Sequence, residues 1–497
     1  MNERPRIPKV WILVGYLVAA AIVCMTLSLL AARITASQLL DQAALQRERV
    51  ETNQPLWQWH THKSRDVIAG RAFGHAELAS DGEALSVTSM DGTPFELGLP
   101  VAWSLDLAHW PILEVRLQNS GAGTLGVVWQ GQSLACLAPV ASKLTPDTRI
   151  LRADLRGLSW QTTGGNRCTS PGVAQMLRLR IQIPAHATLR LASVALLSTD
   201  PTVRSQDAPI DLPNEDVGLT LTQTRNSATP LFRLPGGISA EAMLTLRDRL
   251  RARWPAALIV PAGTMPEAAP SASRTSAKWM ACTIYLLVLA WLAVRPVKGR
   301  WRPWLEIAGC LAGPLWLVIG LNWGLNPTPL GVLAFGGGLA YALTIERRYL
   351  QRLWRWPSTG YEWLWPLATL PVTVLLIVLY GHALHPLPLA HVFTYVGWAL
   401  LQQWLMLVVL LPRFEHIVRR PTLAIFIVAI VFALLHTPNG MLMQLCFVGE
   451  LWWACCFLRS RSVLPIGLAH AACALLVESG LVGGLVRSLE VSGRFFF

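Results

Sequence analysis

Two histidines inside apolar runs are the residues of this chain best placed to do chemistry. His436 ends the apolar run 422–436, directly before the helix-breaking sequence Thr-Pro-Asn-Gly, and His470 lies inside the run 463–485. Ionisable side chains are costly at membrane depth, so they usually mark a site. A histidine can accept a proton from water, position that water or stabilise an oxyanion. The pair therefore predicts a polar pocket inside a helix bundle, with His436 and His470 as candidate catalytic residues.

Three further polar residues in the same half of the chain are candidates for this pocket. Gln402 and Gln403 either position water as part of a catalytic set or bridge helices as buried amides. An amide cannot accept a proton as a carboxylate does, so neither glutamine can be a general base. Glu450 lies near mid-bilayer in the run 441–457, where a carboxylate has to be paired or protonated. It is the candidate replacement acid; the preferred alternative is a hydrogen bond to a glutamine or histidine of a neighbouring helix.

Other polar residues near these runs have less specific interpretations. Asn439 is a candidate binding residue, although capping or breaking a helix beside Pro438 is preferred. His382, His385 and His391 cluster around a predicted outer loop, where a solvated face is expected, and Glu478 is expected at the membrane interface. No Cys-x-x-Cys or Cys/His spacing indicates zinc, so neither a metal nor a cofactor is predicted.

The composition indicates a membrane protein. Of 497 residues, 53% are hydrophobic and only 14% are charged, whereas soluble proteins carry roughly 25% charged residues. The sequence predicts a polytopic α-helical membrane protein with about nine spans, near residues 10–32, 279–294, 304–322, 328–345, 363–380, 389–411, 422–436, 441–457 and 463–485. Because the first run is long, we expect a retained anchor, with cleavage after Ala32 as the alternative.

Basic residues concentrate in alternate loops between these runs. The four basic loops contain Arg295, Lys298, Arg300 and Arg302; Arg347, Arg348, Arg352 and Arg355; Arg413, Arg419 and Arg420; and Arg459 and Arg461. The loops 323–328, 381–390 and 437–441 contain no Lys or Arg. The positive-inside rule therefore predicts a multi-pass protein of a bacterial inner (plasma) membrane, with residues 35–277 extracytoplasmic. The net charge of +13 is explained by this orientation, so the expected partner is membrane lipid rather than nucleic acid.

Residues 35–200 are predicted to form a mostly-β extracytoplasmic domain, after a helical stretch at 36–50. Short alternating segments, such as Leu177-Arg-Leu-Arg-Ile-Gln-Ile, indicate strands with one buried face. The expected strands are 84–89, 112–118, 124–130, 150–154, 177–183 and 188–197. This spacing favours an antiparallel sandwich or jelly roll, and it resembles the galactose-binding-like sandwiches common in carbohydrate-binding modules. An envelope glycan is thus a possible partner.

Tryptophans and cysteines give two further expectations for this domain. Trp57, Trp59, Trp103, Trp110 and Trp129 either stack on sugar rings or pack in the core, and core packing is preferred. Cys136 and Cys168 are the only cysteines outside the apolar runs, so a disulfide between them is expected.

The remaining chain divides into four predicted parts. Residues 1–34 are the anchor, 201–277 a small α/β appendage and linker, 278–360 three accessory spans, and 361–497 the bundle with the histidines. The glycine run 336–338 lacks the setting of a phosphate loop, so close helix packing is expected there.

The bundle resembles a known family. Phe432-x-x-x-His436, Gly449 in a following span, and Leu458-Arg-Ser-Arg-Ser-Val-Leu-Pro-Ile-Gly-Leu-Ala-His470 are similar to the second and third motifs of the CPBP family. This family contains CAAX-processing endopeptidases and bacteriocin-immunity or Abi-type proteins. The resemblance covers roughly residues 360–480 and implies an intramembrane glutamic-type peptidase.

The family's first motif is altered in this chain. Glu-Glu-x-x-x-Arg is expected where the sequence reads Gln402-Gln403-Trp-Leu-Met-Leu407, and Ala474 stands where a polar residue follows the last histidine. The resemblance then leaves two function classes. One is a peptidase homologue that acts on or binds a membrane-associated or exported peptide with altered catalytic residues. The other is an inactive pseudo-peptidase that serves as an envelope binding or assembly platform, with an outer domain that recognises a glycan or protein.

The two histidines raise one geometric difficulty. His436 lies at the far end of its run, whereas His470 lies near the start of its own. The two side chains can meet if the helices tilt, or if the Thr-Pro-Asn-Gly break lies within the membrane against a wet cavity.

Overall fold

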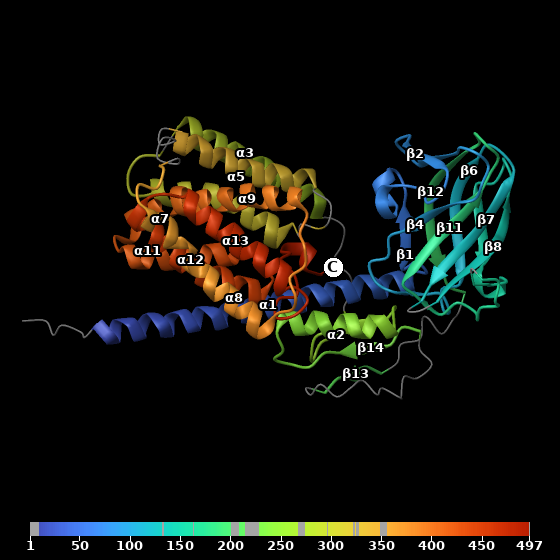
Figure 1. Cartoon of the computed structure of the whole chain (residues 1–497), viewed down its shortest axis with the longest axis horizontal. Helices are drawn as coiled ribbons and strands as arrows, with labels where there is room; N and C mark the ends of the chain where they lie inside the picture. The colour runs from blue at the N-terminus through green and yellow to red at the C-terminus, as the bar shows by residue number, and fades with distance from the viewer. Residues whose placement is uncertain are drawn as a thin grey trace, which may run out of the picture. The chain divides into compact units, whose positions relative to one another are not determined.

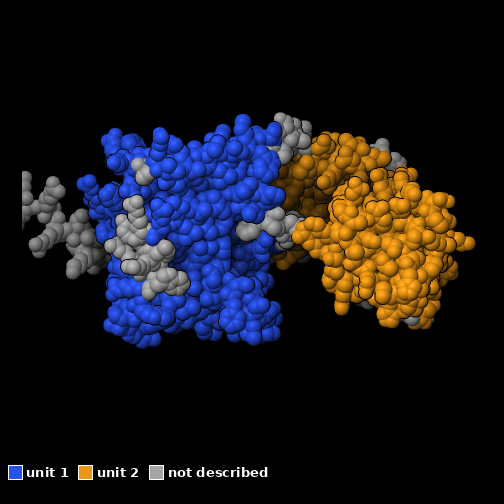
Figure 2. All heavy atoms as spheres, turned by 90° about the horizontal axis from the view of Figure 1, so that it is seen from above, with its two compact units in different colours: residues 1–35, 238–242, 271–497 blue, residues 36–237, 243–270 orange. Residues whose placement is uncertain are grey.

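The computed structural model describes residues 9–131, 134–162, 164–199, 208–213, 228–266, 274–295, 297–321, 324, 328–347 and 355–496. Part of the predicted linker (267–273) and the basic residues Arg348 and Arg352 lie outside these ranges. The chain forms two compact units (Figure 2). The membrane unit comprises residues 1–35, 238–242 and 271–497, and the β unit comprises residues 36–237 and 243–270.

Among the described residues, the β unit contains a two-stranded antiparallel sheet of β5 (Leu105–Asp106) and β10 (Val173–Ala174), in addition to two larger antiparallel sheets (Figure 1). The strands of the larger sheets are β1 Trp57–His60, β2 Ala76–Ser80, β3 Leu85–Ser89, β4 Phe95–Leu99, β6 Ile112–Asn119, β7 Gly123–Gln130, β8 Ala135–Leu144, β9 Ile150–Asp154, β11 Met176–Gln182 and β12 Thr188–Leu197. One sheet has the order β2-β3-β12-β6-β9, with β1 also paired to β12, and the other has the order β4-β11-β7-β8. The prediction of a mostly-β domain is confirmed, and each of the six expected strands is present.

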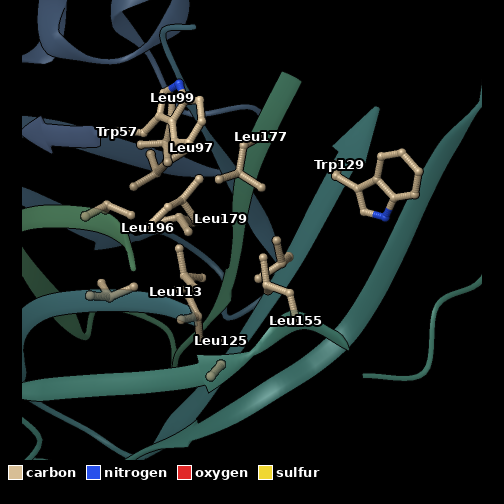
Figure 3. Close-up of a cluster of buried hydrophobic side chains, with 14 of the residues drawn as sticks. Trp57, Leu97, Leu99, Leu113, Leu125, Trp129, Leu155, Leu177, Leu179 and Leu196 are labelled. Atoms are coloured by element: carbon tan, nitrogen blue, oxygen red, sulfur yellow. The ribbon is translucent and has the colours of Figure 1, made fainter. Parts of the chain in front are cut away.

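Side chains of the two sheets form one hydrophobic core (Figure 3). On β11, Leu177, Leu179 and Ile181 are fully buried, while Arg178 and Arg180 between them are partly exposed. This is the period-two pattern that the sequence predicted. The buried leucines remove apolar area from water, which is the main stabilising term for such a sandwich.

The tryptophans belong mostly to this core. Trp57, Trp110 and Trp129 are only 5%, 2% and 7% exposed, so the suggestion that they stack on sugars is wrong and the preferred alternative is correct. Trp57 packs edge-on against Trp110, with ring centroids 5.2 Å apart. Trp59 and Trp103 are half-buried.

A disulfide joins Cys136 of β8 to Cys168. Between them, Gln161 forms an isolated bridge with Leu137, and the Cys168 amide donates to the Trp160 carbonyl. The bond therefore fastens the long connection after β9 to the edge strand β8. β8 itself was not predicted, because Pro139 interrupts its pattern; a bulge opposite Gly126 accommodates the proline.

A small parallel sheet completes the β unit. It has the order β13-β14-β15, with β13 Ile210–Asp211, β14 Leu231–Arg233 and β15 Leu258–Val260, and α2 (Ala240–Arg253) connects its last two strands. The C-terminal half of α1 (Lys9–Glu51) packs on this sheet through Ala43, and Gln46 donates to the Ala256 carbonyl over 2.8 Å. The predicted α/β appendage thus contains the expected helix and strand.

The membrane unit is a helix bundle (Figure 1). Within the described residues, seven helical segments are long and apolar enough to cross a membrane: Val14–Glu51, Ser276–Val294, Arg302–Gly320, Pro329–Glu346, Gly360–Tyr380, Leu389–Val418 and Gly440–Ser460. Two shorter apolar helices are α11 (Pro421–Leu434) and α13 (Leu464–Gly480). The other helices are α3 Arg274–Val294, α4 Arg302–Leu315, α5 Pro329–Glu346, α7 Gly360–Leu364, α8 Thr369–Tyr380, α9 Leu389–Gln403, α10 Leu411–Val418 and α12 Gly440–Ser460. Each predicted run coincides with one of these segments, and the prediction of a polytopic helical membrane protein is confirmed.

Two of the predicted boundaries are wrong. The run expected to end at 411 contains a π-helix (Trp404–Leu410) and continues as α10 to Val418. The last run was expected to reach 485, but α13 ends at Gly480 and the following chain folds back on the bundle. Apolar composition alone does not distinguish a continuing helix from an apolar chain that returns.

Glycines allow the helices α4 and α5 to pack closely, and one cluster of ion pairs joins both helices to α10. A Cβ atom on Gly313 of α4 would lie 2.1 Å from the Ala334 carbonyl oxygen of α5, so these backbones touch. A Cβ atom on Gly337 would lie 2.4 Å from the Leu286 side chain and one on Gly338 3.0 Å from the Tyr285 hydroxyl, as expected for close helix packing, whereas Gly336 faces open space. Arg413 of α10 binds Glu306 of α4 and Glu346 of α5, each over 2.6 Å.

Replacing both cysteines of the disulfide, Cys136→Ala with Cys168→Ala, is expected to destabilise the β unit by about 3–4 kcal/mol, because the unfolded chain loses a closed loop of about thirty residues. Hydrogen exchange of β8 in the full-length protein measures this effect. The matched control is Cys455→Ala, which removes an unbonded cysteine of α12. Unchanged protection of β8 in the double variant would show that the bond does not hold this edge.

Candidate active site

The membrane unit encloses a cavity of about 1050 Å³. Its walls are mostly apolar side chains of α8, α9, α12 and α13. Gln402, His436 and His470 are among its polar lining residues, as are His391 and Glu478. The two histidines predicted to share a pocket therefore line the same cavity.

The turn after α11 positions His436. This helix has 14 residues, which at about 1.5 Å each span about 21 Å, less than the roughly 30 Å of a hydrocarbon core. The His436 ring donates from Nδ1 to the Phe432 carbonyl over 2.8 Å, which satisfies a carbonyl of the last helical turn. Because a carbonyl can only accept, Nδ1 carries the proton and Nε2 is the acceptor of the neutral ring.

His470 is held by two aromatic rings and one amide. Its ring lies 5.5 Å from that of Phe432 and 5.0 Å from that of Trp453, measured between centroids. The side-chain amide of Gln403 lies 3.4 Å from Nδ1 and can donate to it. Phe432 also contacts the His436 ring, at 4.8 Å, so one phenylalanine orients both histidines.

Glu450 lies behind Gln403 and not in the cavity wall. The Gln403 amide donates to a Glu450 carboxyl oxygen over 2.8 Å, and both residues are fully buried. The other carboxyl oxygen and the Gln403 carbonyl oxygen have no partner in the part of the chain that the structure describes. This arrangement is the hydrogen-bonded alternative expected for Glu450. It separates the carboxylate from His470 by an amide.

Gln402 and Gln403 point to different surroundings although they are adjacent. Gln402 lines the cavity and is half-buried, whereas Gln403 is buried at the end of α9. The π-helix Trp404–Leu410 begins directly after them. Such wider turns recur at functional sites, and nothing in the apolar sequence 404–410 signals this one.

Asn439 makes two sets of hydrogen bonds. Its carbonyl oxygen accepts from the Leu442 amide and caps α12, as expected for a residue at this turn. Its amide group donates to the backbone carbonyl oxygens of Ser488 and Glu490, over 2.6 and 3.3 Å. The Ser492 amide also donates to Thr437.

These contacts attach the segment 481–496 to the break between α11 and α12. We call this segment the tail. Its residues Glu490 and Arg494 line the cavity, which sequence reasoning did not foresee. Phe495 and Phe496 of the tail are 0% and 5% exposed, which shows that this segment packs against the rest of the membrane unit.

The three histidines expected on a solvated loop have different surroundings. Both ring nitrogens of His382 face backbone carbonyl oxygens, which only accept, and these contacts with Ala383 and Val482 raise its pKa above the ordinary value. His391 instead pairs with Glu478 over 2.9 Å across α9 and α13, and both residues line the cavity. His391 is thus partly exposed, and it also belongs to the cavity wall.

Among the described residues, no group of three or more His, Cys, Asp or Glu side chains is arranged to hold a metal ion. The cavity thus gathers Gln402, His436 and His470, with Gln403 and Glu450 directly behind them. Asn439 supports the same site from the turn. Cys136 and Cys168 belong to the β unit.

Comparison with known proteins identifies one family match. Residues 384–476 match the family model for type II CAAX prenyl endopeptidase, Rce1-like. The match includes all six candidate residues of the bundle, from Gln402 to His470, and it confirms the predicted resemblance to the CPBP family over this segment. Among curated proteins, no significant match is found.

Several solved structures resemble part of the chain at low similarity. A variant of the family 29 carbohydrate-binding module CBM29-2 is 7% identical, with a TM-score of 0.20, covering 28% of this chain and 83% of its own. The family 11 carbohydrate-binding module of the cellulase Lic26A-Cel5E of Clostridium thermocellum is 7% identical, with a TM-score of 0.21 and coverages of 26% and 86%. The catalytic domain of Agl-KA is 14% identical, with a TM-score of 0.16 and coverages of 32% and 30%. At these scores the likenesses identify no ligand.

Replacing Gln403 by leucine is expected to destabilise the membrane unit by about 1–3 kcal/mol, because the buried Glu450 carboxyl loses its donor. The double variant Gln403→Leu with Glu450→Leu should recover most of this loss, since neither polar group remains. Thermal unfolding of the purified full-length protein in one detergent compares the two. Gln402→Leu, one residue away on the cavity side, is the matched control; additive losses in the double variant would contradict the pairing.

Replacing Asn439 by aspartate is expected to loosen the tail while keeping the helix cap. Aspartate retains an oxygen for the Leu442 amide but lacks the donors to Ser488 and Glu490. Hydrogen exchange should therefore rise in residues 481–496 but not in the first turn of α12. Asn439→Ala should raise exchange in both segments, because it also removes the cap, at about 1 kcal/mol. Equal protection of the tail in wild type and Asn439→Asp would contradict this role.

Proposed function

We propose that this chain is a CPBP-like intramembrane peptidase homologue that binds a membrane-associated or exported peptide beside His436 and His470. The observation that carries the proposal is that these histidines, from helices on either side of α12, line one cavity of about 1050 Å³. Apolar walls with a few polar groups suit a peptide segment that enters from the membrane. The family match over residues 384–476 supports the same class of ligand.

The catalytic set of this homologue is altered. In the described part of the chain, no carboxylate contacts either His436 or His470, because Glu450 is hydrogen-bonded to Gln403 instead. Water activation by a glutamate, as the family resemblance implies, has no counterpart at Gln402 and Gln403. Only His470 can still donate to a bound carbonyl: in its neutral form it carries its proton on Nε2, since Nδ1 faces the donor amide, whereas neutral His436 is protonated on Nδ1.

A second candidate function is that of a pseudo-peptidase that serves as an envelope binding or assembly platform. The buried Gln403–Glu450 pair favours it, because this pair stabilises helix packing and leaves His436 and His470 without a glutamate partner. In this candidate the β unit recognises a glycan or protein. The sugar-stacking role cannot rest on Trp57, Trp110 or Trp129, since these are buried.

The proposed location is a bacterial inner membrane, with residues 35–277 extracytoplasmic. The support is the distribution of Lys and Arg over alternate loops. The Cys136–Cys168 bond agrees with an oxidising compartment. A peptide that is exported or membrane-associated would therefore reach the cavity from the lipid or from the outer side.

Peptide binding is tested with a photoreactive amino acid at Leu445, which lines the cavity. Wild-type protein in inner-membrane vesicles is expected to capture defined peptides there, and the His436→Ala/His470→Ala double variant should capture less. The matched control carries the photoreactive group at Val378 of α8, which is 74% exposed on the apolar surface. Equal capture at Leu445 and Val378 would count against a peptide in the cavity.

A census of new protein termini separates the two candidate functions. It compares wild type, a deletion strain and the double histidine variant at equal expression. Termini that depend on both the gene and the histidines identify a peptidase. Peptide capture with an unchanged census identifies the platform.

A further inference from the structure

His391 and Glu478 form a second ionisable pair in the same cavity. His391 Nε2 lies 2.9 Å from a carboxyl oxygen of Glu478, and both side chains are lining residues. Here a carboxylate contacts an imidazole directly, which is the contact that the Gln403–His470 side of the cavity lacks. A carboxylate that accepts from one ring nitrogen leaves the other nitrogen of the neutral ring as a proton acceptor.

The exposure of this pair suits the activation of water. The side chains of His391 and Glu478 are 40% and 27% exposed, whereas the residues His436 and His470 are only 8% and 4% exposed. Among the described residues, no hydrogen bond to Nδ1 of His391 is found. The His391 side chain is therefore the most accessible of the three, and its Nδ1 is the nitrogen that a water molecule could occupy.

The distance between the His391–Glu478 pair and the deep histidines His436 and His470 fits one extended peptide. His391 precedes Gln402 by eleven residues on α9, and Glu478 follows His470 by eight on α13. At about 1.5 Å per residue these offsets are about 16 and 12 Å. A strand-like peptide advances about 3.3 Å per residue, so about four or five residues reach from the deep histidines to the pair.

We propose that His391, oriented by Glu478, is the general base of a hydrolytic site at one end of this cavity, and that its substrate is an extended peptide also held near His436 and His470. The proposal rests on the proposed peptide binding. His391 is the catalytic residue, and Glu478 is a positioning residue that acts through it. Tyr395, one turn along α9, lines the cavity and offers a hydroxyl that can donate to an oxyanion.

The reaction consists of two heterolytic steps. Nδ1 of His391 takes a proton from water while the water oxygen bonds to the peptide carbonyl carbon, and the carbonyl π electrons move to its oxygen. The tetrahedral intermediate then collapses, the C–N bond breaks, and the leaving nitrogen takes the proton from His391. One water is consumed, and the products are a carboxylic acid and an amine.

The test uses inner-membrane vesicles that contain the full-length chain, with their native proteins as the probe. Peptide capture at Leu445 and formation of new termini are measured together in wild type, His391→Ala and Glu478→Gln. Both variants are expected to retain capture but to form termini at least about 100-fold more slowly, since general-base catalysis contributes about 10²–10⁴-fold. Added imidazole should restore cleavage to His391→Ala, which a merely structural role would not allow.

The matched control is His385→Ala, a histidine of the 381–388 loop whose hydrogen bonds to Ser479 involve only its backbone. It should cleave like wild type. Cleavage that survives in His391→Ala or Glu478→Gln overturns the proposal, as does capture by wild type without any new termini. In both of these cases the proposed peptide binding stands. If wild-type protein captures no peptide at Leu445, both the peptide binding and the role of His391 are overturned.

Discussion

The break between α11 and α12 is buried, with Thr437 and Asn439 at 1% and 0% exposure, and the arrangement of the candidate site follows from how its backbone polar groups are satisfied. Buried backbone polar groups need hydrogen-bond partners from the protein or from ordered water. Here the His436 ring serves the Phe432 carbonyl, the Thr437 hydroxyl serves the Leu434 carbonyl, and Asn439 caps the next helix. The orientation of the His436 ring is thus fixed by a structural hydrogen bond, independently of any catalytic role.

The Gln403–Glu450 pair sets the second constraint. A carboxyl group at this depth costs several kcal/mol unless it is hydrogen-bonded or neutral, and a glutamine can donate to it where a second glutamate could not without a proton. The two amides in place of the family's acids are therefore compatible with a stable bundle. The two amides also leave His436 and His470 without a carboxylate partner. Any acid-base catalysis in this cavity therefore depends on groups elsewhere in its wall.

Sequence patterns predicted the parts of this fold that depend on local alternation or on long apolar runs. The strand at 177–183 followed from period-two burial, and nine apolar runs matched nine helical segments. The strand β8 was hidden by Pro139, because the bulge that accommodates a proline depends on the partner strand. The π-helix after Gln403 was equally invisible, since it inserts an extra residue per turn without any change in composition.

The candidate site could be predicted as a set of residues but not as an arrangement. The spacing of His436 and His470 located the cavity, whereas the partner of Glu450 depends on how α9 faces α12. The pairing of His391 with Glu478 joins residues 87 positions apart and has no local signal. The tail was missed because its apolar composition resembles the end of a span, and only long-range contacts distinguish the two.

The hydrogen bond that the Asn439 side chain accepts and the one that it donates also form at different times during synthesis. Its carbonyl oxygen serves Leu442, which emerges from the ribosome almost at once, whereas its amide serves Ser488, which is 49 residues later. At translation rates of roughly 5–20 residues per second, this interval lasts about 2–10 s. α12 (Gly440–Ser460) is made in the first part of this interval, and the wall formed by the tail is absent until its end. Closure of the cavity by the tail is therefore a late event in biogenesis. Until then the side-chain amide of Asn439 lacks its acceptors, the carbonyl oxygens of Ser488 and Glu490.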